Sequence, residues 1–131
     1  MDTATRELEA VRALAEGTPG LELLVLFGSR GRGNAHRGSD WDFAYLGTAG
    51  LNASRLNAEL SLALRTDRVD VADLASVGGL LRFRAARDGV PVYESREGVF
   101  RDFWLEAVQF WCDARPVLDA SYEVVLARLD R

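Results

Sequence analysis

The sequence predicts an α/β (α+β) fold built on a small mixed β-sheet. Short apolar runs, typical of strands, alternate along the chain with longer segments whose apolar residues recur at helical spacing. The expected strands are residues 21–27, 41–46, 68–74 and 90–94, and the expected helices are residues 3–16, 52–65, 76–88, 97–113 and 117–129. Such interleaving is typical of a sheet covered by helices.

The first elements are defined by their periodicity and by the residues that end them. Leu8, Val11 and Leu14 share one stripe of the expected helix 3–16, and Gly17 ends it. The run LELLVLF (21–27) is short and continuously apolar, which is typical of a buried strand. The glycine-rich segment GSRGRGN follows it, and we expect a turn there that opens a short helix before strand 41–46.

In the middle of the chain, helix-capping residues, glycine and proline indicate where helices and strands begin and end. Asn52 is the expected N-cap of helix 52–65, and RVDVADL (68–74) alternates as a strand does. Gly89 ends helix 76–88, and Pro91 places strand 90–94 at an edge of the sheet. Asp73 is expected to cap the helix that follows strand 68–74.

The expected helix 97–113 carries an aromatic stripe, in which Phe103, Trp104 and Trp111 recur at helical spacing. This stripe packs into the core or forms a partner surface, because large aromatic side chains anchor both. Leu105 and Phe110 fall off the stripe, which allows burial of the helix on two sides. Cys112 is expected to be a small buried hydrophobe.

Composition limits the classes of protein. The chain has 131 residues, enough for one domain with a buried core, and 48% of them are hydrophobic. No apolar run approaches the roughly 20 residues of a membrane span. A net charge of −4 argues against stable nucleic-acid binding. The lone cysteine and the polar N-terminus favour a cytoplasmic protein.

Three aspartates are the candidate metal-binding residues of the sequence. Asp40 and Asp42 are two residues apart at the start of an expected strand, so their side chains point the same way and repel each other. Asp70 completes a cluster of three carboxylates if its strand lies beside theirs. Carboxylate oxygens suit magnesium, and without the metal we expect at least one raised carboxyl pKa.

A second feature, Gly28-Ser29, lies where a buried strand turns toward a helix. Backbone amides at a helix start bind phosphate, and glycine allows close approach of a ligand. Because all 16 basic residues are arginine, a Walker-type P-loop is excluded. Arg30 is the best candidate for a phosphate-binding cation, whereas Arg32 and Arg37 are as compatible with simple surface exposure, and His36 is expected to be exposed.

The ordered set of apolar strand, Gly-Ser, ten residues, Asp-x-Asp and a later strand aspartate resembles the nucleotidyltransferase superfamily of DNA polymerase beta. The short length resembles its minimal nucleotidyltransferases, and residues 80–118 resemble the antitoxins of HEPN/minimal-nucleotidyltransferase toxin–antitoxin pairs. The resemblance implies a single domain over 1–131, with a core at about 20–75, a helical extension at about 97–131 and helices mainly on one face of the sheet.

By this resemblance, Asp40, Asp42 and Asp70 are catalytic and bind two Mg²⁺ ions, and Asp70 helps to activate the attacking hydroxyl. Gly28, Ser29, Arg30 and Ser39 are the expected nucleotide-binding residues. The implied function is transfer of AMP from ATP to a hydroxyl, expected to be a tyrosine, of a cognate HEPN ribonuclease toxin. The chain then acts as its antitoxin and forms a hetero-oligomer with it.

Two alternatives stay open from the sequence. The first is a nucleotidyltransferase that acts on a small molecule or an RNA end, although an acidic chain disfavours RNA. The second is a non-catalytic antitoxin that neutralises its toxin by binding. The intact acid set argues against this second alternative, because clustered carboxylates destabilise a fold that does not use them.

Overall fold

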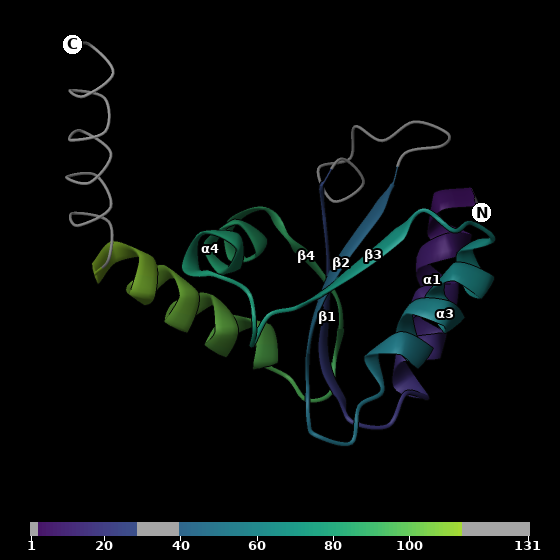
Figure 1. Ribbon diagram of the computed structural model, residues 1–131, viewed down its shortest axis with the longest axis horizontal. Coiled ribbons are helices and arrows are strands. Elements are labelled where there is room, and N and C mark those ends of the chain that lie inside the picture. Colours follow the sequence, from purple (N-terminus) through teal and green to yellow (C-terminus); the bar gives the residue numbers. More distant parts are fainter. Residues whose placement is uncertain (1–2, 29–39, 114–131) are drawn as a thin grey trace, which may run out of the picture.

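The structure is a computed structural model that describes residues 3–28 and 40–113 (Figure 1). In chain order its elements are α1 (Thr3–Glu16), β1 (Leu21–Phe27), β2 (Trp41–Gly47), α3 (Ala53–Leu64), β3 (Val69–Asp73), α4 (Gly79–Asp88), β4 (Val90–Glu94) and helical residues 99–113. These bounds confirm the expected elements within one to three residues. The expected helix 117–129 lies outside the described residues. No helix in the described ranges has the length and apolar character to cross a membrane.

The four strands form one mixed sheet in the order β3-β2-β1-β4. β1 is antiparallel to both of its neighbours, and β2 is parallel to β3. A parallel pair needs a crossover connection, which α3 supplies between β2 and β3. β4 is an edge strand, as Pro91 predicted.

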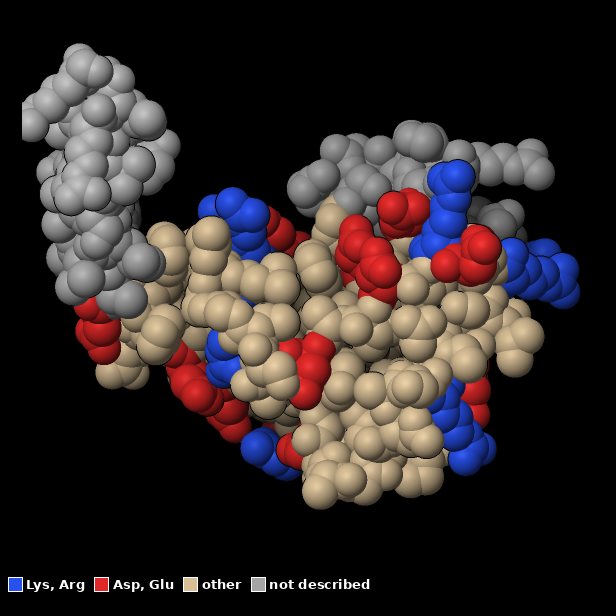
Figure 2. All heavy atoms as spheres, in the orientation of Figure 1, with Lys and Arg blue, Asp and Glu red and all other residues tan. Residues whose placement is uncertain are grey.

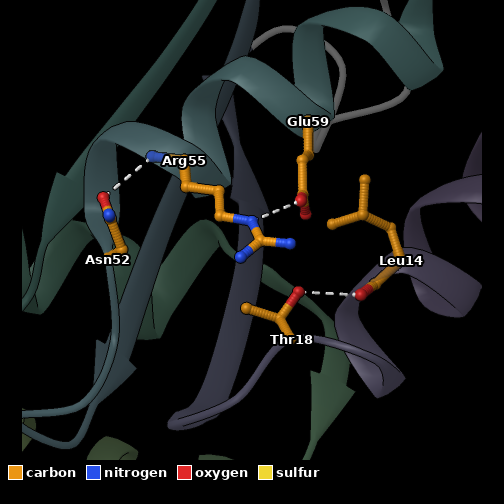
Figure 3. Close-up of polar contacts among 5 residues, drawn as sticks. All are labelled: Leu14, Thr18, Asn52, Arg55 and Glu59. Carbon is orange, nitrogen blue, oxygen red and sulfur yellow. Dashed lines mark hydrogen bonds and ion pairs between the residues drawn. The ribbon is translucent and has the colours of Figure 1, made fainter.

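Local hydrogen bonds fix the ends of the helices beside β1 and β2 (Figure 3). The Asn52 side chain caps α3 by accepting a bond from the Arg55 amide at 3.0 Å, as expected. Arg55 also pairs with Glu59 one turn later, with 2.8 Å between Nε and Oε1. At the end of α1, the Thr18 hydroxyl donates to the Leu14 carbonyl at 2.8 Å.

Apolar side chains bury the sheet on both faces. On one face, Leu24 and Leu26 of β1 pack with Phe43 of β2 and with residues of α1 and α3. On the opposite face, Leu23 and Val25 pack with residues of α4 and of helix 99–113. The fold class is confirmed, but in the part of the chain that the structure describes α1 and α3 cover one face and α4 and helix 99–113 cover the other, whereas most helices were expected on one face. The continuously apolar strand β1 allows this, because it buries both of its sides.

Helix 99–113 is fixed to the sheet at its start and along one side. The Glu94 carboxylate accepts a hydrogen bond from the Phe100 amide at 2.7 Å, which caps the helix from β4. The Arg82 side chain donates to the Leu74 carbonyl and lies 5.3 Å from the centre of the Phe103 ring. Arg82 therefore joins α4, the end of β3 and helix 99–113.

The outer side of this helix differs from the sequence expectation. Phe103 is buried, but Trp104 is 40% exposed, and Leu105 and Phe110 are more than half exposed. Cys112 is exposed, so the prediction that it is buried was wrong. Cys112 comes about two and a half turns after Phe103, so it lies on the side of the helix opposite the core-facing Phe103.

The segment between β3 and α4 also departs from expectation. Asp73 accepts hydrogen bonds from the Ala75 amide (2.9 Å) and the Ser76 hydroxyl (3.0 Å), so it caps a turn and not a helix. α4 begins only at Gly79, with Gly78 as its N-cap. The expectation that Asp73 caps the helix was therefore wrong, because a separate turn comes first.

The close approach of Gly89 to β1 yields a prediction for stability. A Cβ atom at Gly89 would lie 2.2 Å from the Ala85 carbonyl oxygen and 2.3 Å from Val25 Cγ1. Gly89→Ala should lower the free energy of unfolding by about 1–3 kcal/mol, as overpacking does. Gly78→Ala is the control, since nothing lies within 4 Å of its Cβ position, and its change should stay within about 1 kcal/mol. Chemical denaturation of both variants measures the difference; equal values would contradict the packing argument.

Candidate active site

Two of the predicted acids lie level with each other on adjacent strands. The parallel register pairs Asp42 of β2 with Asp70 of β3, between the pairs Trp41–Val69 and Phe43–Val71. Side chains alternate along a strand, so both aspartates share the sheet face opposite Phe43 and Val71. The condition for Asp70 to join the acid set, that its strand lies beside the Asp-x-Asp strand, is met.

Asp40 is exposed and lies two residues before Asp42, just ahead of β2. Its charge contributes to the raised pKa of Asp42. The causes of that raised pKa are, from largest to smallest, partial burial, the charge of Asp70 and the charge of Asp40. The expectation of a raised carboxyl pKa within the acid set is confirmed at Asp42. Burial is the largest single cause.

Gly28 packs directly against the Asp42 carboxylate. Its φ of +74° lies in the region that favours glycine. A Cβ atom there would lie 2.4 Å from Asp42 Oδ2. This contact follows from the antiparallel register, which pairs Phe27 of β1 with Asp42. Glycine at position 28 therefore leaves the space that the Asp42 carboxylate occupies.

The remaining predicted site residues lie outside the described residues. They are Ser29, Arg30 and Ser39. Arg32, His36 and Arg37, which were not among the predicted site residues, lie outside the described residues too. The structure thus brings together Gly28, Asp42 and Asp70, with Asp40 close enough to act on Asp42.

The donor chemistry of the three acids fits magnesium. Carboxylate oxygens are hard ligands, and all three aspartates belong to the same end of the parallel pair β2–β3. Within residues 3–28 and 40–113, however, no three acidic, histidine or cysteine side chains are already gathered around one point as a metal site. A bound cation would have to draw the carboxylates together.

One residue that the sequence reasoning did not name lies beside these acids. Arg68 immediately precedes β3, and its carbonyl oxygen accepts a hydrogen bond from the Trp41 amide at 2.9 Å. The spacing Arg-x-Asp on the strand, the same two-residue offset as Asp-x-Asp, was the signal for it.

A family comparison agrees with this arrangement. The model of the family "Polymerase beta, Nucleotidyltransferase" matches residues 9–98, which include Gly28, Asp40, Asp42 and Asp70. The chain belongs to this family of nucleotidyltransferases.

Two curated relatives of the chain are protein adenylyltransferases, a narrower class than the family. The chain is 34% identical over 97 residues to the protein adenylyltransferase MntA of Aphanizomenon flos-aquae, across 65% of each chain. It is also 34% identical over 94 residues to MntA of Shewanella oneidensis, across 70% of this chain and 67% of the relative. The matched part thus spans about two thirds of the length of these relatives.

Solved structures extend the likeness to nearly the whole chain. A crystal structure of a toxin–antitoxin with AMP-PNP has a TM-score of 0.74 and 25% identity, over 95% of this chain and 99% of that one. A crystal structure of the toxin–antitoxin MntA–HepT has a TM-score of 0.70 and 23% identity, over 93% and 97% of the two chains, and shows a shared fold.

The environment of Asp42 predicts how stability depends on pH. Because the folded-state pKa of Asp42 is raised above its ordinary value of 3.8, the folded protein binds this proton more tightly than the unfolded chain does. The stabilisation is fully present below pH 3.8 and is lost as the pH rises through the raised pKa. Asp42→Asn removes the ionised group, so in EDTA at pH 7 it should melt at the same temperature as the wild type or a few degrees higher.

Thermal denaturation from pH 4 to pH 8 measures this difference. The advantage of Asp42→Asn should shrink as the pH falls toward 3.8. Asp67→Asn, on the exposed turn before β3, is the control and should give no such advantage. An Asp42→Asn protein that melts clearly below the wild type at pH 7 would contradict the argument.

Proposed function

We propose that this chain is a magnesium-dependent adenylyltransferase that transfers AMP from ATP to a hydroxyl of a cognate HEPN ribonuclease toxin, and so acts as its antitoxin. The observation that carries the proposal is the pair Asp42–Asp70 on adjacent strands, with Gly28 packed against Asp42. The 34% identity to two protein adenylyltransferases supports AMP as the transferred group.

In this proposal all three acids bind metal, and Asp70 also acts on the acceptor hydroxyl. Asp40, Asp42 and Asp70 would hold two Mg²⁺ ions, which supply charge neutralisation for the phosphates of ATP and for the leaving pyrophosphate. Asp70 lies on the side of Asp42 away from β1, and there it helps to remove the proton of the acceptor hydroxyl. The hydroxyl oxygen then bonds to the α-phosphorus, and the bond from that phosphorus to the oxygen bridging to the β-phosphate breaks.

The phosphate tail belongs on the other side of Asp42. Gly28 follows β1, and the sheet order places β1 and β3 on opposite sides of β2. In this proposal the backbone at Gly28 and Ser29, with Arg30 and Ser39, holds the β- and γ-phosphates. ATP and the acceptor thus approach the acids from different strands.

A protein acceptor fits the way in which the chain is organised. The four strands of the sheet lie between residues 21 and 94, and helix 99–113 packs on the sheet. We therefore propose that residues 1–131 act as one domain, whose described part contains no separate acceptor-binding unit. The neighbour crystallised with AMP-PNP is a toxin–antitoxin, which supports a toxin as partner. We place the reaction in the cytoplasm, since the lone Cys112 is a free thiol.

Intact mass spectrometry of the cognate HEPN toxin tests this function. Incubation with the chain, ATP and Mg²⁺ should add whole AMP units to a tyrosine, and the Asp40→Ala/Asp42→Ala double variant should add none. A toxin that is neutralised with no change in mass would identify a binding antitoxin and overturn the proposal. Addition of AMP to RNA or a small molecule instead would overturn the choice of acceptor.

The packing of Gly28 gives a further prediction. Gly28→Ala should reduce the rate of AMP transfer about 100-fold, because the new methyl group displaces the Asp42 carboxylate and misplaced catalytic groups cost about that factor. Gly50→Ala is the matched control, since its added atom meets only Thr48 Oγ1, at 3.8 Å. A Gly28→Ala enzyme with wild-type rate would show that the contact with Asp42 has no catalytic role.

A further inference from the structure

The register of β2 and β3 places a cation among the three acids. Asp42 pairs with Asp70, and Asp40 and Arg68 directly precede the first pair of the ladder, Trp41–Val69. The bond from the Trp41 amide to the Arg68 carbonyl (2.9 Å) belongs to the first pair of this ladder, Trp41–Val69, and ties the backbone of Arg68 to the start of β2. Because residues two apart on a strand share a face, Arg68 belongs to the face of Asp70.

Of these four residues, three are acidic and one, Arg68, is basic. Asp42 and Asp70 lie side by side in the register and repel each other, whereas Arg68, two residues before Asp70, brings the opposite charge to the same end of the sheet. Asp40, Asp70 and Arg68 are all exposed. Figure 2 shows acidic and basic side chains mixed over this end of the sheet, at the top of the view.

Arg68 cannot take the place of an acid in binding metal. A guanidinium has five N–H donors and no acceptor atom, so it is never a ligand for Mg²⁺. It acts on this cluster only through its charge and its hydrogen bonds. A guanidinium and a magnesium ion therefore compete for the same carboxylates.

We propose that Arg68 is the resident counter-cation of the acid cluster, which offsets the carboxylate repulsion until Mg²⁺ binds and then gives the carboxylates up to the metal. The inference rests on the metal site of the proposed function. It makes Arg68 a positioning residue that stabilises the cluster before the metal binds and weakens the binding of the metal itself.

These two effects have opposite signs, which separates them from a merely structural role. Removing a structural side chain lowers stability without tightening the binding of a metal. Removing a counter-cation lowers stability in EDTA and also tightens Mg²⁺ binding, because a competitor for the carboxylates is lost.

The test uses the full chain with Arg68→Gln, Arg68→Lys and Arg12→Gln. Arg12 is an exposed residue of α1, on the opposite side of the sheet, so its variant loses the same charge away from the acids. Melting temperature is measured in EDTA at low and high NaCl, and Mg²⁺ affinity is measured by calorimetry. Arg68→Gln should melt about 2–4 °C lower at low salt, less so at high salt, and bind Mg²⁺ about three- to tenfold more tightly.

Arg68→Lys keeps the charge and should restore both values toward wild type. Arg68→Gln that matches Arg12→Gln in both measurements would overturn the inference, and so would weaker Mg²⁺ binding by Arg68→Gln. These results leave the proposed function intact as long as the wild type binds Mg²⁺ and transfers AMP. A wild-type chain that binds no Mg²⁺ would overturn both the metal site of the proposed function and the inference.

Discussion

The parallel pairing of β2 with β3 is the constraint on which the rest of the site depends. Its register is fixed from the buried side, where Trp41, Phe43 and Val69 pack into the core with α1 and α3. A slip of one residue in either strand would turn the side chains of that strand to the other face and carry its aspartate into the core. The hydrophobic pattern on one face thus positions two carboxylates on the other, where their mutual repulsion alone would separate them.

The acids share their face of the sheet with a second core, and small residues make this possible. Ala44 and Ala72 come two residues after Asp42 and Asp70 on the same strands, and they pack in one cluster with Ala85 and Ala86 of α4. Small side chains on both surfaces allow a helix to lie close to a sheet. One end of this face is therefore closed by α4 and helix 99–113, while the end with the acids stays accessible.

The negative charge of the acids both destabilises the fold and suits the site to divalent cations. A partly buried aspartate level with another aspartate has a raised pKa, so its ionised form destabilises the fold at neutral pH. In the proposed function, the same concentration of negative charge would hold divalent cations, which would neutralise the charge of the phosphates. Arg68, which directly precedes β3, is proposed to reduce that cost without supplying a ligand.

The sequence by itself determined the elements and the chemistry of the site, since both are local. Apolar periodicity gave β1 its observed bounds, Asn52 gave the α3 cap and Pro91 the edge strand, and the spacing of Gly28, Asp40, Asp42 and Asp70 indicated the family. Only the tertiary structure decided the two-sided helix cover, the exposure of Cys112, the contact of Gly28 with Asp42 and the place of Arg68. These depend on strand register and packing between distant segments, which a local pattern does not encode.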